Sequence, residues 1–553
     1  MAEQEMTGVT DAALPGDGGY AGRRWVPLWF VAAAAAASAG LVAVGAFGWG
    51  LPDGTHVQSY HPDEQNTTYS LRNMRPKELD FNPRFFGNPT FYTYQVGALA
   101  LAASSTGWVP REMSEDFWLA HPQAVRRFYI LGRSLSFVYA LLSVYFVYAV
   151  TRRVGGHRQA ALLAAAAFAA LPVTAVHSHY MTVNAASVFW CLVAAFFAVG
   201  IINRPSWKNY ILAGVFGGLA ISTKMNNLFV PLAVFAAHLA VPGGARWWRR
   251  LLVGKLWAAW GLAAAAFFAG SPYYLLAYDT VKNDPHNKMN MAALFGFSAP
   301  ASVVLKDFWN HVTAACGWGL AILFLFALAV ALAARLRRLA PVLAVAVPFL
   351  LVAVKSGWWA FPSRLWPLLA FMAIVTGTLL ARAKGAARAA LGVALGAALL
   401  AAIPWNVAYY SLARAPHIRA ESSRWIEANV PAGSRLIILQ TPYFEDPDIV
   451  YENALHPRYV SGPKYEIVDL RGNFGALSGT PGEWLVVPEY LGSALKAKTG
   501  KGIRDYAAAG GFRMEKEFQR TFEAFGWQLR TWIPADMIQD YPVLIFARRA
   551  SAP

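Results

Sequence analysis

An acidic pair, Asp63 and Glu64, lies in the stretch "SYHPDEQN", directly after a long and mostly apolar run of residues. A carboxylate in such a position could deprotonate a hydroxyl group or hold a cation. The same polar segment, residues 50–126, contains His61 and Arg84, and a guanidinium group grips phosphate well. These residue types make the segment a candidate active site. The alternative is a solvated polar loop whose charges have no chemical role.

A second polar group lies at a turn between two later apolar runs. The stretch "LPVTAVHSHYMTVNA" contains His179, Tyr180 and Asn184, which are candidates for binding a substrate. His177 and His179 could ligate a metal, but residues two apart do not share one face of a helix. The alternative is a set of aromatic and polar residues at a membrane interface, so the metal requirement stays open.

Two cations stand at the ends of other apolar runs. Lys224 lies in "GLAISTKMNNLF" and Arg364 lies in "KSGWWAFPSRLWPLL". An ionisable residue at the edge of a bilayer is a functional candidate. The alternative for a lysine is snorkelling, in which the side chain simply reaches toward water. If both cations lie on the same side as Arg84, three separate segments offer positive charge to one anion.

The elements that must position these residues are membrane helices. The chain of 553 residues is 56% hydrophobic and only 14% charged, whereas a soluble domain carries about 25% charged residues. Apolar runs recur over the first 410 positions, and in a bilayer such runs must be helical because each backbone amide has to be satisfied within its own segment. The predicted spans are 25–49, 127–151, 158–176, 181–202, 208–223, 226–241, 249–270, 312–334, 339–355, 364–381 and 387–409.

The orientation follows from the charge of the loops. The basic loop residues all fall on the cytoplasmic side if there are eleven helices and a cytoplasmic N-terminus, as the positive-inside rule requires. A twelfth span at 91–106 would reverse every one of these loops. This short segment is therefore predicted to be an interfacial helix in the first outer loop, with Tyr92 and Tyr94 at the depth of the lipid headgroups. Lys224 and Arg364 then lie on the outer side.

The composition divides the chain into three parts. Residues 1–22 are predicted to be a disordered cytoplasmic N-terminus, and residues 23–411 form the transmembrane domain. Residues 412–553 are well charged and contain the strand-like runs "RLIILQ", "EWLVVPE" and "VLIFAR". They predict a small extracytoplasmic α/β domain. The net charge of +17 is explained by the basic loops rather than by a nucleic-acid groove, and motifs for nucleotide binding are missing from the sequence.

The order of these motifs resembles a known family. "YHPDE", "FNPRFFGNPTFYTYQVGALAL", "GGLAISTK" and "SRLWPLLAFMAI" are similar to the GT-C glycosyltransferases of the protein O-mannosyltransferase and aminoarabinose transferase-like group. The resemblance covers about residues 25–410. It implies a bundle of helices whose first outer loop holds the active site and whose donor is a polyprenyl-phosphate sugar. Asp63 takes the position of the catalytic acid, with Glu64 beside it, and Lys224 and Arg364 would face the carrier phosphate.

One position departs from the family. Many relatives carry an aspartate after the outer turn between the third and fourth helices, where this chain has Asn184. A second catalytic carboxylate and a shared metal site are therefore in doubt, although a divalent cation is not excluded. No other cofactor is expected.

The resulting hypothesis is a sugar transfer with inversion at the outer face of the plasma membrane of a bacterium. Asp63 would be the general base, Lys224, Arg364 and Arg84 would stabilise the leaving phosphate, and Tyr92 and Tyr94 would line the path of the donor. The acceptor would be a glycan, a lipid or a protein, and the enzyme would contact membrane lipid but no nucleic acid. The alternatives are a flippase that carries a lipid phosphate or glycolipid without breaking a bond, and an assembly protein whose tail binds partners.

Overall fold

The computed structural model describes most of the chain, and its residues form two compact units. The described residues are 26–112, 114–243, 246–295, 300–356, 361–443, 445–460, 462–530, 536–538 and 541–548. The helical unit draws on Met1–Phe47, Asn66–Ala100 and Leu131–Tyr409. The sheet unit draws on Gly48–Gln65, Leu101–Ile130 and Tyr410–Pro553. The predicted disordered segment, residues 1–22, lies outside the described residues.

Every apolar segment predicted to span the membrane contains a helix. The bundle helices are α1 (Val26–Gly45), α5 (Pro122–Val154), α6 (Arg158–Ala169), α7 (Pro172–His177), α8 (Val183–Asn203), α9 (Trp207–Thr223), α10 (Pro231–Leu239), α12 (Gly254–Gly270), α16 (Ala301–Ala333), α17 (Ala340–Lys355), α18 (Pro362–Arg382) and α19 (Gly385–Arg414). In the part of the chain that the structure describes, seven helices are long and apolar enough to cross a membrane. The prediction of a mostly helical, polytopic membrane protein is confirmed.

Proline explains why some predicted spans are shorter or broken. The segment 158–176 is divided because α7 begins at Pro172, and Leu171 before it has an extended backbone. A residue that precedes proline is driven out of the helical region by the proline ring. Pro231 similarly starts α10 after a short 3₁₀ helix, Met225–Phe229. These breaks fall next to polar residues, so they help to shape the ends of the bundle.

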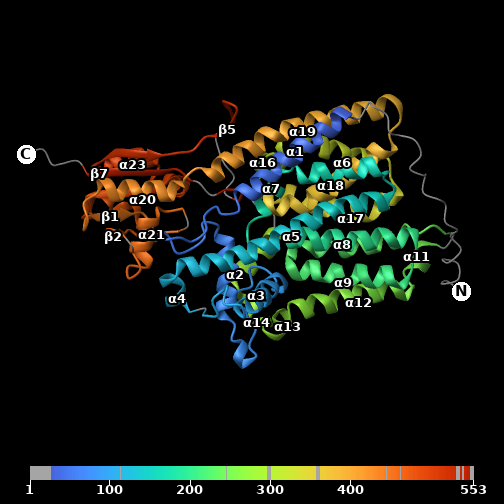
Figure 1. Cartoon of the computed structure of the whole chain (residues 1–553), viewed down its shortest axis with the longest axis horizontal. Coiled ribbons are helices and arrows are strands. Elements are labelled where there is room, and N and C mark those ends of the chain that lie inside the picture. Colours follow the sequence, from blue (N-terminus) through green and yellow to red (C-terminus); the bar gives the residue numbers. More distant parts are fainter. Residues whose placement is uncertain are drawn as a thin grey trace, which may run out of the picture. The chain divides into compact units, whose positions relative to one another are not determined.

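The bundle is organised around two strongly buried helices, α8 and α18. Figure 1 shows the bundle helices running side by side, and α18 packs against α6, α8, α16 and α17. Between α9 and α12, small residues allow close approach. A Cβ at Gly214 would lie 2.3 Å from the Ala259 carbonyl oxygen, and one at Gly218 would lie 2.1 Å from that of Ala263. Such spacing of small residues is typical of helices that pack in membranes.

The predicted interfacial segment forms α3 (Phe91–Ser104), a helix of 14 residues. A helix of this length is too short to cross a bilayer, which needs about 20 residues. Tyr92 is fully buried in the helical unit, whereas Tyr94 is half-buried. The position of α3 at headgroup depth stays a prediction.

The sheet unit is built on a mixed five-stranded sheet with the strand order β2-β1-β3-β7-β4. The strands are β1 (Arg435–Ile438), β2 (Glu466–Asp469), β3 (Trp484–Pro488), β4 (Phe512–Phe518) and β7 (Val543–Arg548), and a separate hairpin joins β5 (Phe522–Ala524) to β6 (Trp527–Arg530). β1 pairs in parallel with β2 and β3, while β7 is antiparallel to β3 and β4. The predicted strands in 435–440, 483–489 and 543–548 are confirmed. The sequence analysis missed β2 and β4.

Helices cover both faces of this sheet. On one face lie α20 (Ile418–Asn429) and α21 (Asp448–Leu455), with Ile426 and Val450 in the core. On the other face lie α22 (Gly492–Thr499) and α23 (Ile503–Ala509), with Leu495 and Tyr506 in the core. Strands buried on both faces explain the continuous apolar runs that revealed them in the sequence.

Part of the first loop belongs to the sheet unit. Residues 48–65 and the short helix α4 (Glu115–Ala120) are grouped with the tail, although several hundred residues of bundle separate them in the sequence. The structure thus places the acidic pair in the sheet unit and most of the other candidate residues in the helical unit.

Candidate active site

The acidic pair opens helix α2 (Pro62–Asn73), with Asp63 and Glu64 in its first turn. Pro62 suits the first position of a helix because the missing N–H would have no partner there. The backbone N–H of Asp63 donates to His61 Nδ1 at 3.2 Å, so His61 caps the helix. Carboxylates in the first turn are stabilised by the helix dipole.

The two acids differ sharply in exposure. Asp63 is exposed, whereas the side chain of Glu64 is 0% exposed and accepts a hydrogen bond from Ser59 Oγ. The hydroxyl oxygen of Ser59 also accepts the backbone N–H of His61 at 3.2 Å. Glu64 therefore holds the turn before α2, while the side chain of Asp63 is exposed.

A loop of the tail lies near Asp63. Burial raises the pKa of the Tyr443 hydroxyl, and the negative charges of Glu445 and Asp63 raise it further. Burial also raises the pKa of the Glu445 carboxyl to about 7. The backbone N–H of Tyr443 donates to Asp446 at 2.9 Å, which fixes this turn. This neighbourhood could not be predicted from the sequence, because the residues follow β1 and lie far from Asp63 along the chain.

A buried ion pair fastens the segment before Asp63 to α20 and α21. Tyr60 donates its hydroxyl hydrogen to Asp448 Oδ2 at 2.7 Å, and Arg419 contacts Asp448 Oδ1 at 2.9 Å. The Arg419 guanidinium also lies 4.8 Å from the centre of the Tyr60 ring. We call these three residues the Arg419 clamp. Because Tyr60 lies three residues before Asp63, the clamp positions the turn that carries the acid.

A glycine makes room for the clamp tyrosine. Gly50 has a φ of +59°, and a Cβ there would lie 2.7 Å from the Cβ of Tyr60. The Tyr60 N–H donates to the Gly50 carbonyl oxygen at 2.9 Å. Gly50 thus permits a close turn that a residue with a side chain would strain.

In the helical unit, Lys224 and Asn184 come together. Lys224 Nζ donates to Asn184 Oδ1 at 2.5 Å, and both side chains are buried. The Asn184 amide nitrogen donates in turn to Thr182 Oγ1 at 3.1 Å. Lys224 ends α9 in an extended conformation, which turns its side chain away from the helix. Since Asn184 is neutral, this contact does not neutralise the charge of Lys224.

A buried arginine that the sequence analysis did not select lies near His179 and Tyr180. Arg133 on α5 is 0% exposed, donates to the Phe47 carbonyl oxygen at 2.6 Å, and lies 5.8 Å from the centre of the Tyr180 ring. The rings of His179 and Tyr180 are 4.4 Å apart. A charged residue within an apolar helix is the sequence signal that could have revealed Arg133.

Tyr92 joins α3 to α5 within the same unit. Its hydroxyl donates to the Gly132 carbonyl oxygen at 3.2 Å and lies 2.8 Å from Ser136 Oγ. Because its side chain is fully buried, Tyr92 fixes α3 to the bundle rather than forming an open surface. Tyr94 donates to the Phe81 carbonyl oxygen at 3.1 Å.

The two remaining candidate cations have other neighbours. Arg84 pairs with Asp80, which also accepts a hydrogen bond from Tyr273 at 3.4 Å. Arg364 lies in the first turn of α18, with its guanidinium 5.3 Å from the centre of the Phe361 ring. Arg84 therefore already faces a carboxylate, which makes it a weaker phosphate ligand than Lys224. Among the described residues, no group of three or more His, Cys, Asp or Glu side chains is arranged to hold a metal ion.

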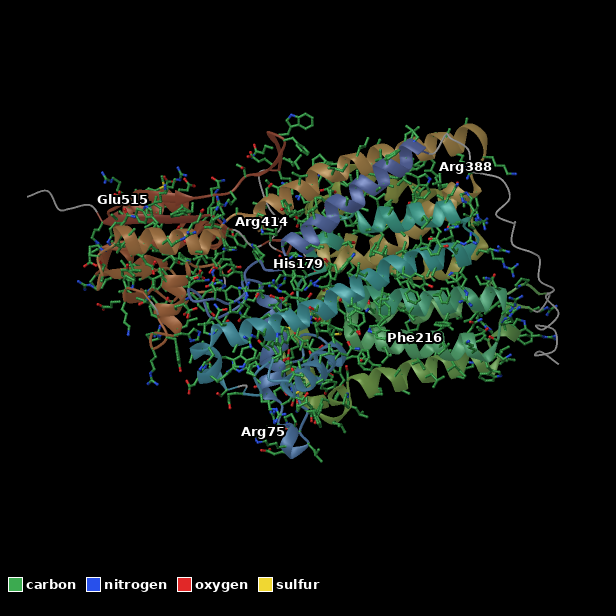
Figure 2. The ribbon with its side chains drawn as sticks, in the orientation of Figure 1. Arg75, His179, Phe216, Arg388, Arg414 and Glu515 are labelled. Atoms are coloured by element: carbon green, nitrogen blue, oxygen red, sulfur yellow. The ribbon has the colours of Figure 1, made fainter. Side chains whose placement is uncertain are left out.

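The basic loops gather at the other end of the bundle. Arg388 contacts His157 Nε2 at 2.6 Å, Arg153 donates to Asn209 at 3.2 Å, and Arg337 donates to the Ala240 carbonyl oxygen at 2.6 Å. Figure 2 shows His179 and Arg388 toward opposite ends of the helical unit. The polar candidates and the basic loops are thus separated along the bundle.

One protein family matches a segment that contains several of these candidate residues. Residues 131–274 match the family described as dolichyl-phosphate-mannose-protein mannosyltransferase. The matched segment contains Arg133, the turn with His179 and Asn184, and Lys224. The match confirms the predicted resemblance to glycosyltransferases of the GT-C type over this segment, residues 131–274.

Three solved structures have a limited likeness to this chain. ArnT from Cupriavidus metallidurans in the apo state is 15% identical, with 85% of this chain and 95% of that chain covered and a TM-score of 0.46. The same protein bound to undecaprenyl phosphate is 14% identical, with 95% and 99% covered and a TM-score of 0.46. The arabinofuranosyltransferase AftD from Mycobacteria is 16% identical, with 95% and 42% covered and a TM-score of 0.37. Because these TM-scores are low, nothing further rests on them. No curated protein sequence matches the chain.

Proposed function

We propose that the protein transfers a sugar from a polyprenyl-phosphate carrier to a hydroxyl group at the outer face of the plasma membrane of a bacterium. The observation that carries this proposal is the contrast within the acidic pair. Asp63 is exposed at the start of α2, whereas Glu64 is buried against Ser59. A general base needs this combination of a reachable carboxylate and a fixed backbone.

In this mechanism, the acceptor hydroxyl oxygen attacks the anomeric carbon of the donor sugar. Asp63 takes the proton of the hydroxyl group, and the bond from the anomeric carbon to the phosphate oxygen breaks. The polyprenyl phosphate leaves with the electron pair of that bond. Attack opposite the leaving group inverts the configuration of the anomeric carbon, so the product has the anomeric form opposite to that of the donor.

Lys224 is the cation best suited to the leaving phosphate. Its contact with the neutral Asn184 orients the ammonium group without cancelling its charge. An aspartate at position 184, as in many relatives, would pair with Lys224 and lower its attraction for an anion. A fixed cation stabilises the charge that develops on the leaving group. Arg364 is a second candidate, whereas Arg84 already faces Asp80.

The donor class is supported by the family match, since its name specifies a sugar on a polyprenyl-type phosphate. The orientation is supported by the basic loops, which the positive-inside rule assigns to the cytoplasm. The end with Lys224 and His179 would then face outward.

The test is transfer of radiolabelled sugar by the purified protein in lipid vesicles. The donors are prenyl phosphates that carry a labelled hexose or pentose, and the acceptors are saccharides, lipids and peptides from the source membrane. We expect Asp63→Asn to lower the transfer rate by about 10²- to 10⁴-fold, the range for loss of a general base. Nuclear magnetic resonance of the product would establish the anomeric configuration.

The matched control is Asp505→Asn, because Asp505 is also an exposed aspartate in the first turn of a helix, α23. We expect this variant to keep full activity. Full activity of a folded Asp63→Asn variant would refute the assignment of the base. Movement of intact donor across the membrane without any transferred sugar would favour the flippase instead.

A further inference from the structure

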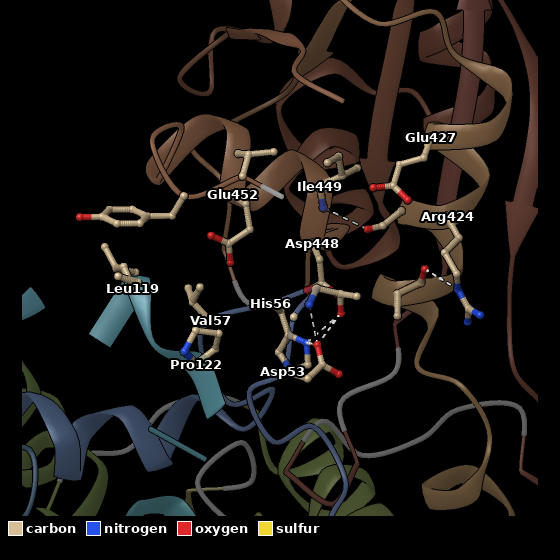
Figure 3. A pocket seen from close by; sticks show the side chains of 17 residues that line it. Asp53, His56, Val57, Leu119, Pro122, Arg424, Glu427, Asp448, Ile449 and Glu452 are labelled. Atoms are coloured by element: carbon tan, nitrogen blue, oxygen red, sulfur yellow. Dashed lines mark hydrogen bonds and ion pairs between the residues drawn. The ribbon is translucent and has the colours of Figure 1, made fainter. Parts of the chain in front are cut away.

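The sheet unit contains a pocket of about 500 Å³ that is separate from the acidic pair. Its walls come from three segments that are distant in the sequence: the loop 53–57, the end of α4 with Pro122, and the facing sides of α20 and α21. Figure 3 shows Asp53 and His56 on one wall and Glu452 on the wall opposite. The volume lies within the range of about 300–1,000 Å³ that is usual for small-molecule sites.

Among the described residues that line this pocket, two buried polar atoms have neither a hydrogen-bond partner nor an ion pair. They are Nε2 of His56 and Oε2 of Glu452. The side chains of His56 and Glu452 are 5% and 6% exposed, and both line the pocket. A buried polar atom without a partner costs about 1–3 kcal/mol. The fold tolerates two such atoms in one cavity, which is expected where a ligand supplies the missing hydrogen bonds.

The other bonds of these two residues hold them in place. His56 Nδ1 lies 3.2 Å from Asp53, and the His56 ring stacks on Tyr60 at 4.2 Å. The backbone N–H of Val57 bonds to the Glu452 carboxyl group. The free atoms are therefore presented by rigid side chains, so the ordering cost of binding is low.

The charge of the pocket limits which ligands can bind. Four carboxyl groups line it, on Asp53, Glu427, Asp448 and Glu452, and Arg424 is the lining cation. Burial raises the pKa of Asp53, but hydrogen bonding to His56 and Thr55 and the charge of His56 lower it by more, so Asp53 is ionised. A phosphate or sulfate would be repelled, which excludes the carrier phosphate of the donor from this pocket.

Hydroxyl groups can form hydrogen bonds with the carboxyl and imidazole groups of this pocket. A hydroxyl group can donate to a carboxylate and accept a hydrogen bond from an imidazole N–H. Apolar lining from Val57, Pro122 and Ile449 could contact the C–H face of a sugar ring. An array of hydroxyl groups on an otherwise apolar ring is the chemistry of a saccharide.

The geometry points to a saccharide-binding site in this pocket, with His56 Nε2 and Glu452 Oε2 as its central hydrogen-bonding atoms. The saccharide is part of the acceptor, an assignment that rests on the proposed function. The loop 53–57 leads through Tyr60 to Asp63, so an acceptor held here lies on the segment that carries the base. The site gives the enzyme a preference for acceptors that are already glycosylated.

The experiment is saturation-transfer nuclear magnetic resonance on the full chain in phospholipid nanodiscs, which contain no sugar headgroups. The probes are mono- to tetrasaccharides of mannose, glucose, galactose and arabinose, together with inorganic phosphate and spermidine as anionic and cationic probes. We expect at least one saccharide to bind, while phosphate does not. Binding of spermidine or phosphate without any saccharide, or no binding at all, would overturn the inference.

Two variants test the location of the site. Glu452→Gln removes an acceptor and keeps the shape, and Ala420→Phe fills the pocket from α20 without removing a partner. We expect each to weaken saccharide binding by about 10-fold or more. Glu452→Gln removes a hydrogen-bond partner of the saccharide, and the ring of Ala420→Phe occupies the space of the sugar. Glu523→Gln, on the exposed side of β5, is the control and should bind normally. Unchanged binding in both pocket variants would place the saccharide elsewhere.

Transfer assays on the same samples separate this inference from the proposed function. If Ala420→Phe raises the KM for glycosylated acceptors but not for the prenyl-phosphate donor, the pocket is the acceptor site. If saccharides bind and no sugar is transferred from any donor, the proposed function fails while the binding site stands. If transfer proceeds with an unchanged acceptor KM in both variants, the assignment of the saccharide as acceptor fails.

Discussion

The helical unit and the sheet unit treat buried charge in opposite ways. In the helical unit, Lys224 donates to a neutral amide and Arg133 donates to a backbone carbonyl oxygen. In the sheet unit, Arg419 meets the carboxylate of Asp448, and further carboxyl groups surround it. The proposed function assigns the phosphate of the donor to the helical unit, and the proposed pocket assigns hydroxyl groups to the sheet unit.

This difference matches the two substrates of the proposed reaction. The donor carries a phosphate on a lipid and needs positive charge at the end of a membrane bundle. The acceptor needs a base and hydrogen-bond acceptors, and in the proposed reaction these are Asp63 and the pocket at Glu452 of the sheet unit. The following predictions test whether the two units have these separate roles.

The largest expected effect follows from removing the cation of the Arg419 clamp. Arg419→Met would leave the buried carboxylate of Asp448 without its cation, and breaking a buried pair in this way costs about 3–5 kcal/mol. Hydrogen–deuterium exchange should show loss of protection in α20 and α21 but not in α8 or α18. The control, Arg513→Met, removes an exposed pair with Glu515 and should leave exchange unchanged. Equal effects of the two variants would show that the clamp does not stabilise the sheet unit.

The next effect concerns the cation of the helical unit. Lys224→Gln keeps a polar side chain near Asn184 but removes the charge that would face the carrier phosphate. A charged hydrogen bond contributes about 1.5–3 kcal/mol, so the transfer rate should fall by roughly 10- to 100-fold. Binding of saccharides to the sheet unit should not change.

The control for this variant is Lys282→Gln, which changes an exposed lysine on α14 (Tyr278–Asn283). Steady-state kinetics with a prenyl-phosphate donor would compare the transfer rates of Lys224→Gln and Lys282→Gln. If Lys224→Gln lowers saccharide binding as strongly as it lowers transfer, the division between the units is wrong.

The remaining prediction is a pH dependence of stability in the sheet unit. Burial raises the pKa of Glu445, Asp446 and Glu452 to about 7, above the values near 4 of the unfolded chain. The folded state then binds more protons than the unfolded state between about pH 4.5 and 7, so stability falls as the pH rises through this window. The expected loss is about 1.4 kcal/mol per pH unit at most for each group.

Hydrogen–deuterium exchange of the α21 amides, recorded during thermal unfolding at pH 5.5 and at pH 8, would measure this dependence. Glu452→Gln should reduce the slope, because one of the three titrating groups is removed. The helical unit serves as the internal reference, since α8 and α18 contain no carboxyl group. A sheet unit that is more stable at pH 8 than at pH 5.5 would contradict the prediction.

Much of the fold could be predicted from local sequence. Apolar runs long enough for a bilayer fixed the positions of the helices, and proline residues such as Pro172 only adjusted their ends. Three strands of the tail were recognisable because continuous apolar runs mark strands that are buried on both faces. β2 and β4 escaped detection because both are short or exposed and carry charged residues.

The site was only partly predictable. The residue types of the acidic pair and the cation at Lys224 suggested the chemistry, and the family match supports the class of enzyme. The catalytic roles of Asp63, Glu64 and Lys224 stay predictions. Residue type alone does not rank Asp63 above Glu64, because both are acids in the same helical turn. The family resemblance favoured Asp63, and only packing shows that Glu64 is buried and Asp63 exposed.

The sequence by itself determined the membrane helices, the strands of the tail core and the chemical groups at hand, because hydrophobicity and residue type act locally. Only the tertiary structure decided which acid is exposed, that Tyr60 meets Asp448 across 388 residues, and that His56 and Glu452 face one pocket. The physical reason is that burial and long-range hydrogen bonds depend on which segments pack together. The pair of acids in "SYHPDEQN" thus separates into a buried residue, Glu64, and an exposed residue, Asp63.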